Sequence, residues 1–152
     1  AIMTSDGISR RTFVGRLPLV GGGIACGLQA VSLTACAGTP YVRPTTAPEG
    51  LSVPLDAPGT DGGVLVQSSG MERPVYLRRD TSSGEWVALL ASCTHRGCQP
   101  DPVGERLVCP CHGSEFSLMG EVLEGPAERP LRRYPVTREG DRLVIHIDGR
   151  RP

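Results

Sequence analysis

The sequence predicts an all-β domain of small antiparallel sheets, and three observations indicate this class. The chain has 20 glycines and 14 prolines among 152 residues but only 4% aromatic residues, a composition typical of turns and short strands. Short apolar or alternating runs are separated by turn signals such as Asp61-Gly62-Gly63 and Thr81-Ser82-Ser83-Gly84. No window with the period of a helix follows the amino-terminal segment. We therefore expect one modest domain with an appendage.

Six runs are the expected strands of this domain. Four of them precede the cysteine-rich region, and two follow it as a hairpin around the turn at 138–141. The runs are Leu51–Leu55, Gly63–Gln67, Pro74–Arg78, Glu85–Ala91, Leu131–Val136 and Arg142–Ile147. Trp86 is expected in the core, whereas His146, which alternates with Ile145 and Ile147, is expected to face solvent.

Charge does not indicate a nucleic-acid partner. Lysine and arginine number 16, and so do aspartate and glutamate, which gives a formal net charge of +0. Nucleic-acid-binding domains normally carry a basic excess, so no such partner is expected. The arginines at 129, 132 and 133 are expected to form a solvated face, with a docking patch for an acidic cytochrome as the alternative.

Residues 1–37 are expected to be a twin-arginine export signal or a membrane anchor. Arg10 and Arg11 stand just before an uncharged run, Leu17 to Ala37, of 21 residues. This length is near the roughly 20 residues that span a bilayer as a helix. Twin-arginine signals export folded proteins, which suits a chain that receives a metal cofactor in the cytoplasm. The folded domain is therefore expected on the periplasmic side of the membrane.

Three outcomes stay open for this segment. It can remain uncut as a hydrophobic anchor helix, or Leu33-Thr34-Ala35-Cys36 can act as a lipobox that leaves Cys36 as a lipid-bearing amino terminus. Ala35-Cys36-Ala37 also resembles an ordinary signal-peptidase site. Cys26 is expected to be no more than a small apolar residue.

Residues 38–50 are expected to be a proline-rich linker. Prolines at 40, 44 and 48 exclude a helix and a central strand, and a polyproline segment of this length reaches roughly 40 Å. Such a linker would hold the domain, expected over 51–152, away from the membrane. A loop packed on the domain surface is the alternative.

Two short clusters of cysteine and histidine carry the chemistry. The expected loops, 92–98 and 109–117, contain Cys93-Thr94-His95-Arg96-Gly97-Cys98 and Cys109-Pro110-Cys111-His112-Gly113-Ser114. Thiolates and imidazoles at this density are ligands for zinc, copper or an iron-sulfur centre, and disulfides are a fourth possibility in an exported protein. An ordinary zinc finger does not keep two spare cysteines, and disulfides alone leave both histidines unexplained.

These two motifs resemble the paired motif of Rieske [2Fe-2S] proteins. In that family one iron takes two cysteines and the other takes two histidines. The resemblance implies that Cys93 and Cys109 bind the inner iron, that His95 and His112 bind the outer iron, and that the remaining cysteines, Cys98 and Cys111, form a disulfide. It also implies a domain of three small antiparallel sheets, and Gly125-Pro126-Ala127 resembles the proline-containing loop that shields the cluster.

The same resemblance implies roles for residues around the ligands. Gly97 and Gly113 let the loops approach the inorganic sulfides, so that backbone N–H groups can donate to them. The Ser114 hydroxyl donates to a bridging sulfide. The imidazoles of His95 and His112 each keep one nitrogen that can carry a proton, so both are expected at the point of proton-coupled electron entry.

Two neighbouring positions depart from the pattern of high-potential, quinol-oxidising members. Phe116 stands where those members carry a tyrosine that donates to a ligand sulfur, and an intermediate potential is expected within the roughly −150 to +300 mV range of such clusters. Arg96 stands where bc complexes typically have leucine, at a tip that docks on cytochrome b. A charge at this tip disfavours that docking mode.

The resemblance implies a membrane-tethered electron carrier. The leading hypothesis is the iron-sulfur subunit of a quinol-oxidising cytochrome bc-type complex, with cytochrome b and a c-type cytochrome as partners and quinol as donor. Catalysis would then belong to the quinol:cytochrome c oxidoreductase as a whole. The alternatives are the small Rieske subunit of a periplasmic molybdenum oxidase resembling arsenite oxidase, a free-standing lipoprotein shuttle, and a structural zinc module. A Rieske oxygenase component is disfavoured because such components lack the extra cysteine pair.

Overall fold

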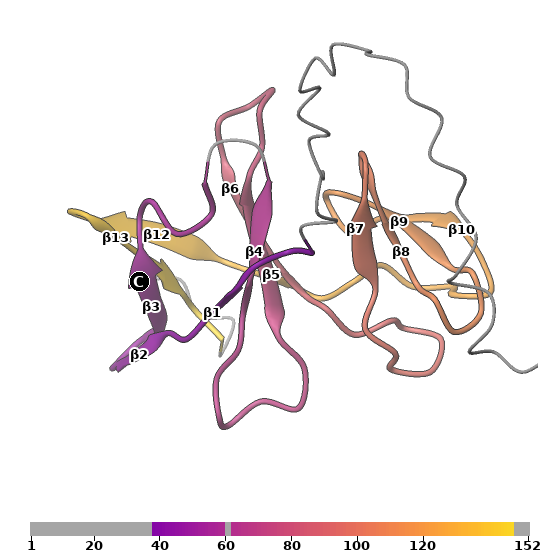
Figure 1. The fold of residues 1–152 in the computed structure, drawn as a ribbon, viewed down its shortest axis with the longest axis horizontal. Helices are drawn as coiled ribbons and strands as arrows, with labels where there is room; N and C mark the ends of the chain where they lie inside the picture. Colours follow the sequence, from indigo (N-terminus) through magenta and orange to yellow (C-terminus); the bar gives the residue numbers. More distant parts are fainter. Residues whose placement is uncertain (1–37, 60–61, 148–152) are drawn as a thin grey trace, which may run out of the picture. The chain divides into compact units, whose positions relative to one another are not determined.

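The computed structural model describes residues 38–59 and 62–147, which form thirteen strands in three sheets and no helix (Figure 1). The expected all-β fold of small antiparallel sheets is confirmed for these residues, except that one strand pair is parallel. The signal or anchor expected over 1–37, with Cys26 and Cys36, lies outside the described residues. In the described part of the chain, no helix is long and apolar enough to cross a membrane.

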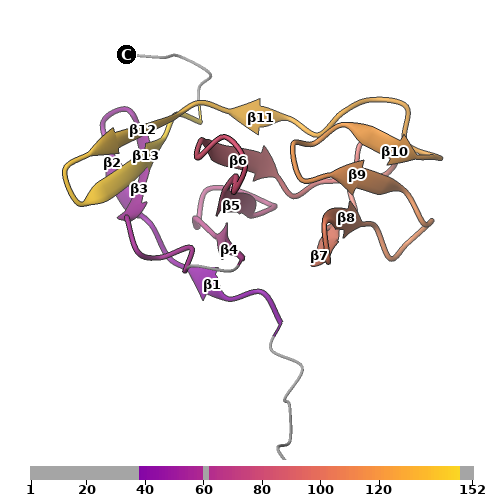
Figure 2. The same cartoon turned by 90° about the horizontal axis from the view of Figure 1, so that it is seen from above.

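A five-stranded sheet lies between the other two sheets (Figure 2). Its strands contribute to two hydrophobic cores. Its strands in spatial order are β1 (Tyr41–Val42), β4 (Gly63–Val66), β5 (Val75–Arg79), β6 (Trp86–Leu90) and β11 (Arg133–Tyr134). Successive side chains of a strand point to opposite faces. Leu65 therefore enters one core and its neighbours Val64 and Val66 enter the other. This explains why the central strands are apolar at consecutive positions.

The second sheet packs on one of these cores. Its strands in spatial order are β12 (Val136–Glu139), β13 (Arg142–Ile145), β3 (Gly50–Pro54) and β2 (Thr45–Ala47). Leu51, Val53, Leu143 and Ile145 fill the space between this sheet and the five-stranded one.

The third sheet carries the cysteine-rich region. Its strands in spatial order are β10 (Val122–Glu124), β9 (Glu115–Ser117), β8 (Arg106–Val108) and β7 (Asp101–Val103). Leu107 and Phe116 bury their side chains against Leu89 and Leu131 in the other core, together with Cys93 and Cys109. The second loop therefore begins and ends on strands anchored in this core, and the first loop follows β6, whose Leu89 lies in the same core.

Residues 38–50, expected as a linker, differ from that expectation. They contribute β1 and β2 at the edges of two sheets, and the Leu65 N–H donates to the carbonyl of Pro40 at 2.9 Å. The three prolines lie between or beside the strands, because proline has no N–H for a strand ladder. The strands here are two and three residues long for the same reason.

The expected strands before the cysteine-rich region agree with the structure to within about one residue at each end. The expected strand Leu131–Val136 is wrong as one unit, because β11 pairs with β6 whereas β12 begins at Val136 and forms the hairpin with β13. The four strands of the third sheet were not expected, since each is only three residues long.

Two side-chain expectations also need correction. His146 lies one residue beyond β13 and is buried, with 2% of its surface exposed, and its Nε2 is 2.8 Å from the Thr137 hydroxyl. Trp86 is half-buried at the edge of the core rather than within it. The Arg79 guanidinium lies 5.8 Å from the centre of its ring.

Candidate metal centre

The two loops that carry cysteine and histidine share one backbone geometry. In the first loop the Cys93 N–H donates to the Cys98 carbonyl at 2.8 Å, and the Gly97 N–H donates to the Cys93 carbonyl at 2.7 Å. The second loop repeats both bonds sixteen positions later. There the Cys109 N–H donates to the Ser114 carbonyl at 2.8 Å, and the Gly113 N–H donates to the Cys109 carbonyl at 3.0 Å. Each loop thus holds its leading cysteine in the same way.

The glycine of each loop is required by its backbone conformation. Gly97 and Gly113 both have φ of 76°, in the left-handed region that glycine adopts without steric cost. The nearest atom to a Cβ at Gly97 would be the Ser92 hydroxyl at 3.9 Å, and none lies within 4 Å at Gly113. The left-handed backbone by itself therefore disfavours other residues here, since no protein atom crowds either position.

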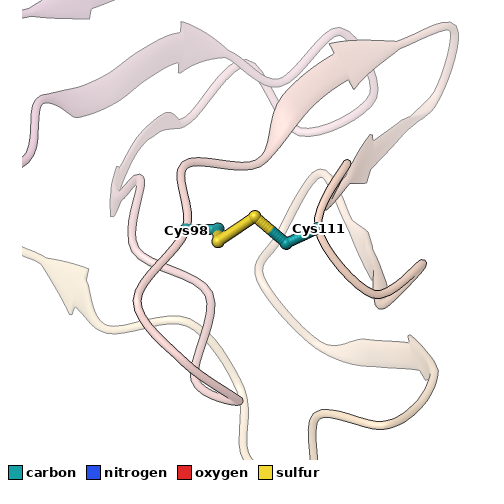
Figure 3. Close-up of a disulfide and its surroundings, with 2 residues drawn as sticks. All are labelled: Cys98 and Cys111. Atoms are coloured by element: carbon teal, nitrogen blue, oxygen red, sulfur yellow. A yellow bond between two sulfur atoms is a disulfide. The ribbon is translucent and has the colours of Figure 1, made fainter.

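A disulfide joins the tips of the two loops. Cys98 and Cys111 are bonded with an S–S distance of 2.06 Å and a Cα–Cα distance of 6.5 Å (Figure 3). The disulfide implied by the resemblance is therefore present. The sulfurs of Cys98, Cys109 and Cys111 lie within 4.8 Å of one another, but the bridged pair cannot act as thiolate ligands. Of these three, only Cys109 can bind a metal as a thiolate.

Cys93 and Cys109 are the free thiols of the site, and both are buried. Burial by itself raises the pKa of Cys93, but hydrogen bonds from the His95 backbone and the Cys109 thiol outweigh it, so the pKa lies below its ordinary value. Burial and the adjacent Cys93 sulfur hold the pKa of Cys109 above its ordinary value. The two sulfurs are therefore neighbours in a dry setting that suits a shared metal centre.

The two imidazoles also lie together. The rings of His95 and His112 have centroids 4.7 Å apart and are nearly perpendicular, at 88°. His112 is exposed, whereas Nδ1 of His95 is buried and has no hydrogen-bond partner among the described residues. A buried polar atom without a partner costs about 1–3 kcal/mol. A metal bound at this nitrogen would remove the penalty, so the donor set fits an iron site.

Ser114 connects the thiols to a third loop. Its side chain is fully buried, and its Oγ accepts a hydrogen bond from the Ala127 N–H at 3.0 Å. The hydroxyl proton remains available, and it donates to the Cys93 thiol, which lowers the pKa of that thiol. The third loop, residues 125–132, connects β10 to β11 and begins with the Gly125-Pro126 peptide bond, which is cis. The proline-containing loop expected from the sequence thus contacts Ser114, which in turn donates to the Cys93 thiol.

Two contacts of the first loop were not expected from the sequence. The Thr94 hydroxyl donates to the Arg129 carbonyl at 2.5 Å, and the Gln99 amide donates to the Tyr41 hydroxyl at 2.9 Å. Thr94 stands between two proposed ligands and Gln99 follows the bridged Cys98, but neither residue type carries a recognisable signal there, and their partners are 35 and 58 residues away. The first bond ties the loop to the third loop, and the second ties it to β1.

Comparison with known proteins identifies the family. Residues 57–135, just over half of the chain, match the family model of the Rieske [2Fe-2S] domain. The chain belongs to the Rieske [2Fe-2S] family. Its cofactor is therefore a [2Fe-2S] cluster, and it is an electron-transfer protein. The resemblance seen in the sequence is confirmed.

Relatives of this Rieske protein include iron-sulfur subunits of cytochrome complexes. It is 37% identical over 93 residues to cytochrome b6-f complex iron-sulfur subunit 2 of Trichormus variabilis, covering 54% of this chain and 52% of the relative. It is 46% identical over 71 residues to the ubiquinol-cytochrome c reductase iron-sulfur subunit of Rhodobacter capsulatus, covering 44% and 37%. The chain spans about half or less of the length of the curated relatives it matches.

A solved structure shows the same fold. A chain of a hyperthermophilic respiratory Complex III matches with a TM-score of 0.51 and 26% identity, covering 64% of this chain and 75% of that one. This agrees with the three-sheet architecture described above.

Proposed function

We propose that Cys93 and Cys109 bind one iron of the cluster and that His95 and His112 bind the other. The observation that carries this assignment is the buried, unpartnered Nδ1 of His95, beside a second imidazole and a pair of buried thiols. The disulfide supports it, because it removes the other two cysteines of the loops from the set of ligands. When bound, the cluster supplies one-electron redox chemistry at a potential raised by the neutral imidazoles.

The residues of this ligand set and those around it have different roles. Buried Cys93 and Cys109 exclude water from one side of the centre, while exposed His112 presents an imidazole to a partner. With a cluster bound, the ring nitrogen of His95 and of His112 that does not hold iron would be left to hold or release a proton at the point of electron entry. Gly97 and Gly113 permit the loop backbone, and the Ser114 hydroxyl donates to sulfur.

We infer that the chain is the iron-sulfur subunit of a quinol-oxidising cytochrome bc-type complex. Its relatives, iron-sulfur subunits of a cytochrome b6-f complex and of a ubiquinol-cytochrome c reductase, support this inference, as does the exposed imidazole of His112. In this assignment cytochrome b and a c-type cytochrome are its partners, and residues 1–37 place the domain at the periplasmic side of the membrane. Because Pro40 already bonds to β4, a tether that lets the domain move would have to precede it.

One feature favours a second candidate. Arg96 is exposed and charged beside His95, at a position where docking on a membrane cytochrome calls for an apolar side chain. This supports a shuttle to a soluble cytochrome, or the small subunit of a periplasmic molybdenum oxidase, as the alternative functions.

Isolation of the intact chain from its own membranes in mild detergent tests the proposal. We expect an optical and EPR spectrum of a histidine-ligated [2Fe-2S] cluster, together with co-purifying haems b and c. Co-purification of molybdenum, or of no redox partner, would replace the bc-type assignment by one of the alternatives. Loss of the histidine-ligated spectrum in His95→Cys and His112→Cys, but not in His146→Gln, tests the ligand set. An unchanged spectrum in either ligand variant would contradict it.

A further inference from the structure

Two exposed arginines belong to the segments that hold His95. Arg96 follows His95 directly in the first loop. Arg129 lies in the third loop, where its carbonyl accepts the hydrogen bond from Thr94, the residue before His95. Both arginines are therefore attached to the segment that carries His95, one through the chain and one through a hydrogen bond.

These two guanidinium groups remain available to a partner. Within residues 38–59 and 62–147, neither forms an ion pair, and Glu128 beside Arg129 is itself exposed. The other arginines of the sequence patch are engaged: Arg132 stacks 5.0 Å from the Tyr134 ring, and Arg133 lies 3.7 Å from Glu85. Of the arginines expected to form a patch at 129, 132 and 133, Arg129 is therefore the one without such a contact among the described residues. Arg96 is the second arginine of the proposed docking face.

The overall charge of the protein supplies no attraction at this face. The chain has a formal net charge of +0, so it exerts no strong long-range attraction of either sign. A cluster with two ferric ions, two sulfides, two thiolates and two neutral imidazoles is neutral when oxidised, and it is negative when reduced. A positive field at the histidine face would therefore be produced by Arg96 and Arg129.

We propose that the face formed by His95, His112, Arg96 and Arg129 docks an acidic electron-transfer protein, one that presents carboxylates around its own redox centre. The proposal rests on the proposed function, because it assumes that electrons pass at the histidine face. Charge complementarity favours an acidic occupant, because two exposed arginines, Arg96 next to His95 and Arg129 bonded through its carbonyl to Thr94, favour carboxylates and disfavour a basic partner. The transfer itself moves one electron, so that the reduced chain is oxidised and a ferric haem of the partner becomes ferrous.

A matched pair of partners tests this proposal. The probe is a basic c-type cytochrome and the same cytochrome after succinylation of its lysines, which reverses its surface charge and keeps its haem. Association with the cluster-loaded chain is measured by calorimetry with both proteins reduced, so that no electron can move. Stopped-flow oxidation of the reduced chain is measured separately as salt is raised. We expect tighter association and faster transfer with the succinylated form, and we expect both differences to fade as the Debye length shrinks from roughly 30 Å at 0.01 M salt to 3 Å at 1 M.

Charge-removing variants locate the effect. Arg96→Gln and Arg129→Gln together should weaken association with the succinylated cytochrome by roughly 3- to 10-fold at low salt, within the range of electrostatic steering. Arg138→Gln is the matched control, because Arg138 is also exposed but lies on β12 in another sheet. It should change association less than about 2-fold.

Several outcomes would overturn the docking proposal. These are an equal loss in the control, no loss in the double variant, tighter association with the basic cytochrome, or binding to anionic phospholipid vesicles in place of the acidic cytochrome. A normal cluster spectrum with any of these results contradicts the docking proposal alone. A preparation without a histidine-ligated spectrum contradicts the proposed function instead.

Discussion

The hydroxyl of Thr94 donates a hydrogen bond of 2.5 Å to the backbone carbonyl of Arg129, 35 residues further along the chain. Thr94 lies between Cys93 and His95, two of the proposed iron ligands, so this bond attaches the first cluster loop to the third loop. The Ala127 N–H bonds to Ser114 in the second loop. The third loop thus braces both cluster loops by one hydrogen bond each.

Removal of the Thr94 hydroxyl is expected to weaken this brace. Thr94→Val keeps the shape of the side chain and should lower the free energy of unfolding by about 1 kcal/mol, the net contribution of a typical hydrogen bond. The cluster absorbance should also decay faster in the presence of a chelator. Thr46→Val, at an exposed position of β2, is the control, and equal decay rates in the two variants would contradict the bracing role.

Removal of the disulfide is expected to lower the free energy of unfolding more than removal of the Thr94 hydroxyl does. Cys98 and Cys111 are 13 residues apart. A disulfide that closes a loop of about this size lowers the entropy of the unfolded chain and so stabilises the folded state by roughly 3 kcal/mol. Cys98→Ser combined with Cys111→Ser should lower the free energy of unfolding by up to about that amount, measured in guanidinium with the cluster bound. Reductant should destabilise the native chain and leave the double variant unchanged. A double variant as stable as the native chain would show that the bridge contributes little.

A hydroxyl added at Phe116 is expected to raise the reduction potential. Phe116 is fully buried in the same core as Cys93 and Cys109, and a tyrosine there could donate to a ligand sulfur. One hydrogen bond of about 1 kcal/mol that favours the reduced cluster corresponds to roughly 40 mV for a one-electron couple. Redox titration of Phe116→Tyr, followed by circular dichroism or EPR, measures the shift. An unchanged or lower midpoint would contradict this explanation.

A side chain at Gly113 is expected to strain the second loop. Its φ of 76° costs roughly 1–2 kcal/mol for an L-residue, although no atom lies within 4 Å of the added Cβ. Gly113→Ala should therefore lower the unfolding free energy by about 1 kcal/mol and reduce the yield of cluster-loaded protein. Gly70→Ala is the control, because Gly70 has equal space and no positive φ, and it should be neutral or slightly stabilising. Equal losses of stability in Gly113→Ala and Gly70→Ala would contradict the explanation by backbone strain.

The sequence by itself determined the chemistry and the longer strands. Spacing within each loop placed Cys93 near His95 and Cys109 near His112, since residues two or three apart in a short loop stay close in any fold. Runs of four or five apolar or alternating residues, such as Val64 within Gly63–Val66, were recognisable because their period and their bounding turns are local properties.

Only the tertiary structure decided what pairs with what over long distances. The three-residue strands β7 to β10 are too short to show a period, and β1 and β2 are strands because their backbone groups find partners in β4 and β3. His146 is buried because sheet packing covers it, although its local pattern resembles an exposed strand position. The brace from Thr94 to Arg129 and the freedom of Arg96 depend in the same way on contacts between distant segments. Local residue patterns do not encode such contacts, because backbone hydrogen bonds and side-chain packing between segments are settled only when the sheets assemble.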